Sequence, residues 1–232
     1  MSSMAKKKAA PRKPALLQVR GITRAFGERT ILSGVDLDVR AGEAVGVVGP
    51  NGSGKSTLLR CIVGADEADG GESTLAGTVL DERRPEIRAD LAVVMDDVDF
   101  FPDLSVVEHL DLVARAHSQA DAEEVVNVVL AEVGLMEVSG QLPSTLSSGQ
   151  RRRLALASAF VRPRKLLVLD EPEARLDVEG VTWLGDKLVA EKKAGRAVLL
   201  VSHDPGLVER VCDRVVRLGP APDSAAEPTD VD

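Results

Sequence analysis

Alternation of apolar and polar residues marks the first half of the chain. It runs through residues 16–20 and 35–40, and similar segments follow at 74–80 and 91–95. A period of two places successive side chains on opposite faces of a strand. We therefore predict that these four segments belong to an antiparallel layer.

Short continuous apolar runs have a different meaning. Residues 43–48, 166–169 and 197–201 are such runs, and each is followed by glycine or polar residues. Runs of this kind are typical of parallel strands that are buried on both faces. They predict a mostly parallel sheet.

Helical periodicity occupies two regions. From about residue 100 to 160 apolar residues recur at helical spacing, for example at Val126, Val129 and Val133. Residues 178–194 form a second helical segment, which Gly195 ends. The pattern as a whole predicts an α/β fold with a mostly parallel sheet, an antiparallel β layer and an inserted helical subdomain.

Composition narrows the class of protein. The 232 residues carry a net charge of -8, which suits nucleic-acid phosphates poorly, so we expect no nucleic-acid partner. Residues 1–14 form a basic tail that we expect to be disordered, either solvated or attracted to anionic lipid or an acidic surface. Residues 219–232 predict an acidic disordered tail. No segment approaches the roughly 20 apolar residues of a membrane span.

The segment 49–56 fits G-x-x-x-x-G-K-[ST], the loop that cradles nucleotide phosphates. A Gly-rich turn between a strand and a helix N-terminus gathers backbone N–H groups around one small space. Lys55 is expected at the β- and γ-phosphates, and Ser56 is expected to offer its hydroxyl to Mg²⁺. The predicted nucleotide-binding residues of this loop are Gly49, Pro50, Asn51, Gly52, Ser53, Gly54, Lys55, Ser56 and Thr57.

Polar residues end both later apolar runs. Asp170 is placed to hold Mg²⁺ through water, and Glu171 to accept a proton from an attacking water. A strand that merely ends in a polar turn is the alternative, and the phosphate loop argues against it. His203 follows the other run and could reach a γ-phosphate, although such a histidine is often only a turn residue. We expect His109 and His117 to be surface residues.

The segment 146–150, Leu-Ser-Ser-Gly-Gln, closely resembles the Leu-Ser-Gly-Gly-Gln signature of ABC (ATP-binding cassette) transporter ATPases. The order of phosphate loop, signature, acidic strand and histidine strand is also that of the family. The resemblance implies a P-loop NTPase core and an ABC-type ATPase domain over residues 15–218, with the helical subdomain at about 100–160.

The family mechanism implies two cassettes that face each other head to tail and enclose two ATP molecules. Each ATP contacts the phosphate loop of one chain and the signature of the other. The resemblance places Asp177 in the loop that crosses the dimer. It also places Phe26 where the family has an aromatic ring under the adenine. The signature residues expected to contact ATP in trans are Ser147, Ser148, Gly149 and Gln150.

Two positions depart from the family pattern. Ser148 replaces the usual glycine, and Asp96 stands where the family has a glutamine that serves Mg²⁺. Two interpretations of Asp96 remain open. It either binds Mg²⁺, directly or through water, or it is a solvated loop acid and the site works without it.

The resemblance implies an enzyme that hydrolyses ATP to power a membrane transporter, with ATP and Mg²⁺ as cofactors. The motif set resembles exporter-type subunits more than importer-type ones, which favours export. Separate transmembrane subunits and a homodimer or a paired second cassette are the implied partners. The implied location is the cytoplasm, peripherally on the inner face of the membrane. A soluble non-transport ABC ATPase and a weakly hydrolysing regulatory cassette are the alternatives.

Overall fold

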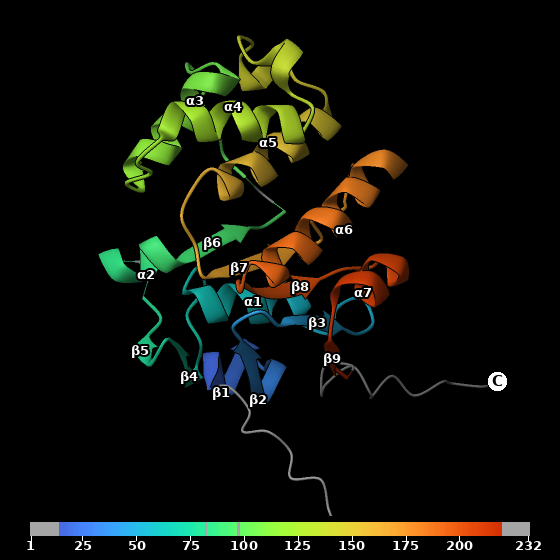
Figure 1. Cartoon of the computed structure of the whole chain (residues 1–232). Helices are drawn as coiled ribbons and strands as arrows, with labels where there is room; N and C mark the ends of the chain where they lie inside the picture. Colours follow the sequence, from blue (N-terminus) through green and yellow to red (C-terminus); the bar gives the residue numbers. More distant parts are fainter. Residues whose placement is uncertain (1–13, 82, 97, 220–232) are drawn as a thin grey trace, which may run out of the picture.

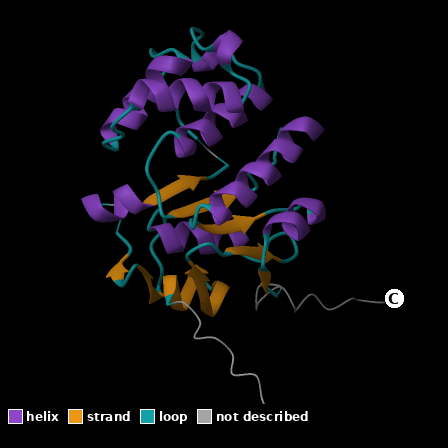
Figure 2. Ribbon diagram, viewed as in Figure 1, coloured by secondary structure: helices purple, strands orange, loops and turns teal. Residues whose placement is uncertain are grey.

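The computed structural model describes residues 14–81, 83–96 and 98–219. Its strands form two sheets, and the five-stranded parallel sheet lies above the four-stranded antiparallel sheet in Figure 1. A group of helices lies at the top of the same view, on the other side of the parallel sheet (Figure 2). The predicted α/β fold, with a mostly parallel sheet, an antiparallel layer and a helical insertion, is therefore confirmed. The two expected tails lie outside the described residues, apart from residues 14 and 219.

The parallel sheet has the order β6-β7-β8-β3-β9. Every residue of β7 and β8 is buried, as their continuous apolar runs predict. The strands are β3 (Ala44–Val48), β6 (Leu91–Val94), β7 (Leu166–Asp170), β8 (Ala197–Val201) and β9 (Arg214–Arg217).

The assignment of residues 91–95 to the antiparallel layer is wrong. Strand β6 pairs in parallel with β7, with Leu91 beside Leu166. A strand of four residues is too short for its pattern to separate alternation from burial on both faces. The neighbouring strand, not the local pattern, decides which sheet β6 joins.

The antiparallel sheet has the order β2-β1-β4-β5. Residues 74–80, expected as one strand, are split by a turn in which Ala76 and Gly77 have φ of +52° and +82°. The strands are β1 (Ala15–Phe26), β2 (Arg29–Arg40), β4 (Gly70–Leu75) and β5 (Thr78–Val79).

Helices cover both faces of the parallel sheet (Figure 1). The inserted helical group contains α3, α4 and α5, and α6 confirms the helix predicted at 178–194. The helices are α1 (Lys55–Val63), α2 (Pro85–Asp90), α3 (Val106–Ala116), α4 (Ala122–Glu132), α5 (Ser148–Phe160), α6 (Val178–Lys193) and α7 (Pro205–Val211), with 3₁₀ turns at Met136–Val138 and Pro143–Thr145.

Two hydrophobic clusters lie on opposite faces of the parallel sheet. Leu167 and Leu169 of β7 belong to the cluster that includes the helical group. Leu166 and Val168 of the same strand belong to the cluster that includes α1 and the antiparallel sheet. The alternate residues of one buried strand thus fix both layers, and with them the position of the strand end where Asp170 lies.

His109 is not the surface residue that we expected. It is 5% exposed, its Nε2 lies 3.1 Å from Ser158 Oγ, and its ring packs against Phe100 and Phe101. Burial lowers its pKa, which favours the neutral imidazole. Helical spacing alone does not distinguish a neutral histidine on the buried face from one in solvent.

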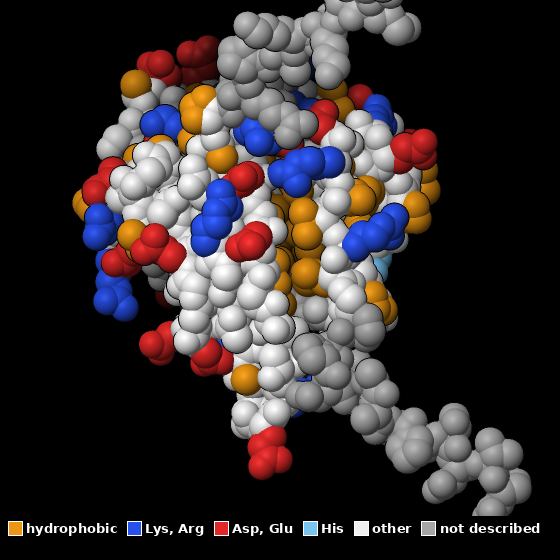
Figure 3. Space-filling model, turned by 90° about the horizontal axis from the view of Figure 1, so that it is seen from below, with side chains coloured by type: hydrophobic (Ala, Val, Ile, Leu, Met, Phe, Trp, Pro, Cys, Tyr) orange, Lys and Arg blue, Asp and Glu red, His pale blue; other side chains and the backbone are white. Residues whose placement is uncertain are grey.

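On the face seen from below, acidic and basic side chains are interspersed around a strip of hydrophobic side chains, and neither sign dominates (Figure 3). Such a face offers no continuous basic surface for a polyanion. Within residues 14–81, 83–96 and 98–219, no helix has the length and apolar character of a membrane span.

Candidate functional site

The Gly-rich loop joins β3 to α1, as the sequence predicts. Gly54 precedes α1 with φ of +87°, a left-handed conformation that favours glycine. A Cβ on Gly49 would lie 2.5 Å from the carbonyl oxygen of Leu218 and 2.7 Å from Ser53 Oγ. The two glycines therefore allow a tight loop, and the first N–H groups of α1 are left without partners inside the helix.

Two buried polar groups of this loop lack a counter-charge or a partner. Lys55 is 6% exposed, and its Nζ donates hydrogen bonds of 3.0 Å to the carbonyl oxygens of Gly49 and Pro50. Ser53 is 2% exposed, and its Oγ has no hydrogen-bond partner among the described residues. Buried polar groups of this kind are costly unless a ligand completes them. An anion with several oxygens, such as a phosphate chain, fits that need.

Asp170 ends β7 beside the loop and is 2% exposed. Burial raises the pKa of its carboxyl group, and a hydrogen bond with Ser56 opposes that rise. Its Oδ1 has no partner within the part of the chain that the structure describes. Mg²⁺ prefers oxygen ligands, so Ser56 and Asp170 together fit this ion.

Glu171 and His203 come from the ends of neighbouring strands. Nε2 of His203 lies 2.9 Å from Oε1 of Glu171, and both side chains are partly exposed. Glu171 has φ of +46°, a strained conformation for a residue other than glycine. Strain of this kind persists only where the surroundings hold it, and it occurs often at functional sites.

Glu173 supports this pair, although no sequence motif marks it. Its Oε1 accepts hydrogen bonds from Ser202 Oγ at 2.6 Å and from the backbone N–H of His203 at 2.9 Å. The segment after β7 is thereby joined to the segment after β8. The contact spans about thirty residues of sequence, and only the parallel pairing of β7 with β8 creates it.

The phosphate loop, Glu171 and His203 line one pocket of about 510 Å³. The structure therefore brings together the loop, the expected general base and the expected γ-phosphate contact. The lining residues are Asn51, Gly52, Gly54, Lys55, Ser56, Thr57, Glu171 and His203. Their chemical roles stay predictions.

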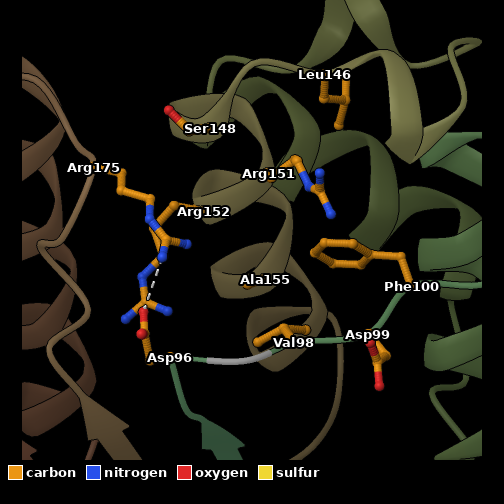
Figure 4. A pocket seen from close by; sticks show the side chains of 10 residues that line it. All are labelled: Asp96, Val98, Asp99, Phe100, Leu146, Ser148, Arg151, Arg152, Ala155 and Arg175. Carbon is orange, nitrogen blue, oxygen red and sulfur yellow. Dashed lines mark ion pairs between the residues drawn. The ribbon is translucent and has the colours of Figure 1, made fainter.

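Asp96 does not line this pocket. It lines a second pocket of about 490 Å³, between the loop after β6 and the start of α5 (Figure 4). Its Oδ1 lies 3.6 Å from a guanidinium nitrogen of Arg175, and about half of each side chain is exposed. Neither interpretation from the sequence foresaw this ion pair, because nothing in the sequence pattern marks Arg175.

The signature forms the N-terminus of α5. Ser147 is the N-cap, where its Oγ accepts from the N–H of Gln150 and its own N–H donates to Gln150 Oε1 at 2.9 Å. Ser148 lines the second pocket, and a Cβ on Gly149 would lie 3.0 Å from the carbonyl oxygen of Arg175. None of the residues 147–150 lines the phosphate pocket of the same chain.

Asp177 is the N-cap of α6. Its Oδ1 accepts from the N–H of Gly180 at 2.9 Å and from Arg153 at 2.8 Å. The Gly180 hydrogen bond, followed by Arg153, holds the pKa of this carboxyl group below its usual range. Asp177 is thus joined to the signature helix, and its expected place at a dimer interface stays a prediction.

Phe26 ends β1 and is 51% exposed. The guanidinium of Arg24 lies over its ring, 4.6 Å from the centroid. Arg24 is itself paired with Asp66 and Asp69, so this face of the ring is covered by a fixed cation. Stacking of Phe26 on adenine stays a prediction and requires the other face of the ring.

Comparison with known proteins connects this geometry to one family. The family model described as ABC transporter matches residues 32–174. An uncharacterised ABC transporter ATP-binding protein of Bacillus subtilis, YdbJ, is 36% identical over 87% of this chain and 65% of its own length. The glutamine transport ATP-binding protein GlnQ of Escherichia coli is 31% identical over 87% of this chain and 86% of its own. This chain therefore spans slightly less than two thirds of the first relative and most of the second.

A solved structure of the ATP-binding subunit of an ABC transporter has a TM-score of 0.82 and 28% identity, over 89% of this chain and 87% of its own. Other relatives are named for opposite directions of transport. A Pseudomonas aeruginosa relative at 37% identity is named for import of spermidine and putrescine. A Cupriavidus pinatubonensis relative at 33% identity is named for export of Nod factor.

Proposed function

The chain belongs to the ABC transporter family as an ATP-binding protein and ATPase, and we propose that its ATP-driven dimerisation powers a membrane transporter. The observation that carries this proposal is the single pocket that joins the phosphate loop to Glu171 and His203. The membrane-spanning part would be supplied by separate subunits, with this chain bound peripherally on the cytoplasmic face.

Binding rests on the loop residues. The N–H groups at the start of α1 and the ammonium of Lys55 would hold the phosphates, and Ser53 would donate its free hydroxyl. Ser56 and Asp170 would hold Mg²⁺, which neutralises charge on the phosphate oxygens when it is bound.

Hydrolysis rests on the strand ends. Glu171 would take a proton from a water molecule as its oxygen bonds to the γ-phosphorus, and the bond to the β–γ bridging oxygen breaks. His203 contacts Glu171 directly and would orient the carboxylate and contact the γ-phosphate. The products are ADP and inorganic phosphate.

A second copy would complete the site. Ser147 and Gly149 lie outside the phosphate pocket of their own chain, so the signature can contact ATP only across an interface. Its position at the N-terminus of α5 directs a helix dipole and free N–H groups at the partner's phosphates. We therefore propose a head-to-tail dimer, either of two copies or with a second cassette.

The second pocket would receive the membrane subunit. It lies between the helical group and the parallel sheet, and Phe100 presents an aromatic ring beside Asp99 and Arg151 (Figure 4). An amphipathic segment with its own charges suits such a mixed lining. The earlier expectation of export has no support, because the relatives include proteins named for import, and the direction is not part of the proposal.

A weakly hydrolysing regulatory cassette is the second candidate. The observation that favours it is Asp96, which pairs with Arg175 and is not among the residues lining the phosphate pocket. The two candidates differ in rate, and both bind ATP.

Hydrolysis of ATP by the purified chain tests the proposal. Lys55→Ala should lose both ATP binding and phosphate release, and Glu171→Gln should keep binding but lose release. Lys165→Ala, which removes an exposed lysine paired with Asp90, is the matched control and should behave as wild type. Wild-type protein that binds ATP without releasing phosphate would favour the regulatory candidate, and no binding at all would overturn both.

A further inference from the structure

Arg152 is a buried arginine in the second turn of α5, with only 3% of its surface exposed. Its guanidinium donates to four backbone carbonyl oxygens. Nη2 donates to Asp170 at 2.7 Å and to Glu171 at 2.6 Å. Nε donates to Pro172 at 3.2 Å, and Nη1 donates to Met95 at 2.8 Å. One side chain thus joins the signature helix to the ends of β7 and β6.

No carboxylate forms an ion pair with Arg152 in the described part of the chain. Burial lowers the pKa of its guanidinium, and the charge of Asp96 opposes that effect. Burial of a cation without a paired carboxylate is expensive, and the position of this guanidinium is narrowly fixed because all three of its nitrogens donate to backbone carbonyl groups. Figure 4 shows the ion pair of Arg175 with Asp96, and Arg152 lines the same pocket.

The carbonyl groups that Arg152 binds belong to the strained turn of the candidate general base. Glu171 has φ of +46°, and its own carbonyl oxygen accepts the shortest of the four bonds. The next carbonyl on either side is bound as well. These bonds hold the backbone that sets the direction of the Glu171 side chain.

We propose that Arg152 is a positioning residue that couples the signature helix to the general base of the same chain. The proposal rests on the proposed function. In the dimer, α5 begins at the ATP bound by the partner, whereas Glu171 serves the ATP bound by its own chain. When α5 shifts on contact with the partner's ATP, the guanidinium transmits the shift to the Glu171 turn. ATP bound at one site thereby changes the position of the general base at the other site.

The first test separates this role from a purely structural one. Arg152→Lys keeps the charge but has a single donor nitrogen that cannot span two chain segments, and Arg152→Gln removes the charge. In both, we expect kcat to fall by about 100-fold, as a misplacement of about 1 Å does. The KM and the ATP affinity of both variants should stay within about twofold of wild type. The ATP-driven dimerisation of double variants that also carry Glu171→Gln should stay within about twofold of that of Glu171→Gln alone.

The control is Arg115→Gln, which removes an exposed arginine of α3 that pairs with Asp111 and should leave all values unchanged. Values of kcat within twofold of wild type in both variants would overturn the proposal. Parallel loss of ATP affinity, dimer and kcat would assign Arg152 a general structural role and would also overturn it. Failure of wild type to hydrolyse ATP would instead refute the proposed function.

Mixed dimers assign the effect to one chain. One copy carries Glu171→Gln, so only the site with the other copy's Glu171 turns over. Arg152→Lys placed in the copy with the working Glu171 should lower that turnover by about 100-fold. The same change placed in the Glu171→Gln copy, which supplies the signature to the working site, should lower turnover far less. The reverse pattern would show that Arg152 shapes the signature and does not position the base.

Discussion

Nε2 of His203 lies 2.9 Å from Oε1 of Glu171, and the two residues lie just after the neighbouring parallel strands β8 and β7. The contact places an imidazole ring against the candidate general base. Glu173 Oε1 accepts a hydrogen bond from the backbone N–H of His203. The parallel pairing of β7 with β8 therefore positions the candidate catalytic pair.

His203→Ala should lower kcat by about 100-fold, because the Glu171 carboxylate loses the side chain that would hold it in position. ATP affinity should change little, because the loop and Lys55 are untouched. Steady-state phosphate release with equilibrium nucleotide binding measures both quantities. A tenfold or greater loss of ATP affinity at unchanged kcat would contradict the contact's catalytic role.

Asp96→Ala should leave the Mg²⁺ requirement of hydrolysis almost unchanged. The carboxylate faces Arg175 in the second pocket, and an exposed ion pair of this kind contributes under about 1 kcal/mol to stability. Titration of activity with Mg²⁺ checks this. Loss of a metal ligand would raise the half-maximal concentration by about tenfold or more, which would restore the ligand interpretation.

Ser147 has a structural role in its own chain and a proposed binding role in the partner's site. Ser147→Ala should lower the free energy of unfolding by about 1 kcal/mol through loss of the N-cap. Ser147→Asp should recover that stability, since aspartate caps well, but should still lose hydrolysis because its charge repels the phosphates.

Ser105→Ala is the matched control for Ser147, because Ser105 forms the same kind of capping box on α3. It should lose similar stability and keep its hydrolysis rate. Denaturant unfolding and phosphate release measure the two effects. Full activity in Ser147→Asp would remove Ser147 from the ATP contact.

His117 makes the fold sensitive to mild acid. Burial, together with the charges of Arg162 and Arg88, lowers its pKa from 6.5 to about 4. The folded state therefore binds a proton at His117 less readily than the unfolded state does. The stability that the neutral imidazole contributes is complete above about pH 6.5 and is lost as the pH falls toward 4. After a discount for solvent screening it amounts to about 1 kcal/mol.

His117→Gln should remove that part of the pH dependence. Urea unfolding of both proteins between pH 7 and pH 4 gives the difference, and other acids and bases cancel in it. Parallel stability curves over this range would show that His117 does not have the assigned pKa.

The sequence predicted the elements whose signal is local. The structure places the loop at Gly49–Ser56 between β3 and α1, and Asp170 and Glu171 at the end of β7, as expected, because strand ends and a Gly-rich turn determine these positions. The predictions for strand β6 and for His109 were wrong because the environments of both depend on residues that are distant in the sequence. Strand β6 joins the parallel sheet, and His109 is buried.

Arg152, Glu173 and Arg175 could not be found in this way. Arg152 is one of three successive arginines, and only the fold separates its buried guanidinium from the others. Its bond to Met95 joins segments 57 residues apart. Such contacts follow from the packing of α5 against two strand ends, which no short pattern contains.

The most direct test of the account is the mass of Glu171→Gln in ATP and Mg²⁺. Size-exclusion chromatography with light scattering should show a dimer, near twice the 24.6 kDa of one chain, with ATP. The same protein should be a monomer with ADP, as should Lys55→Ala with ATP. A Glu171→Gln protein that binds ATP and remains a monomer would contradict the head-to-tail dimer on which the account depends.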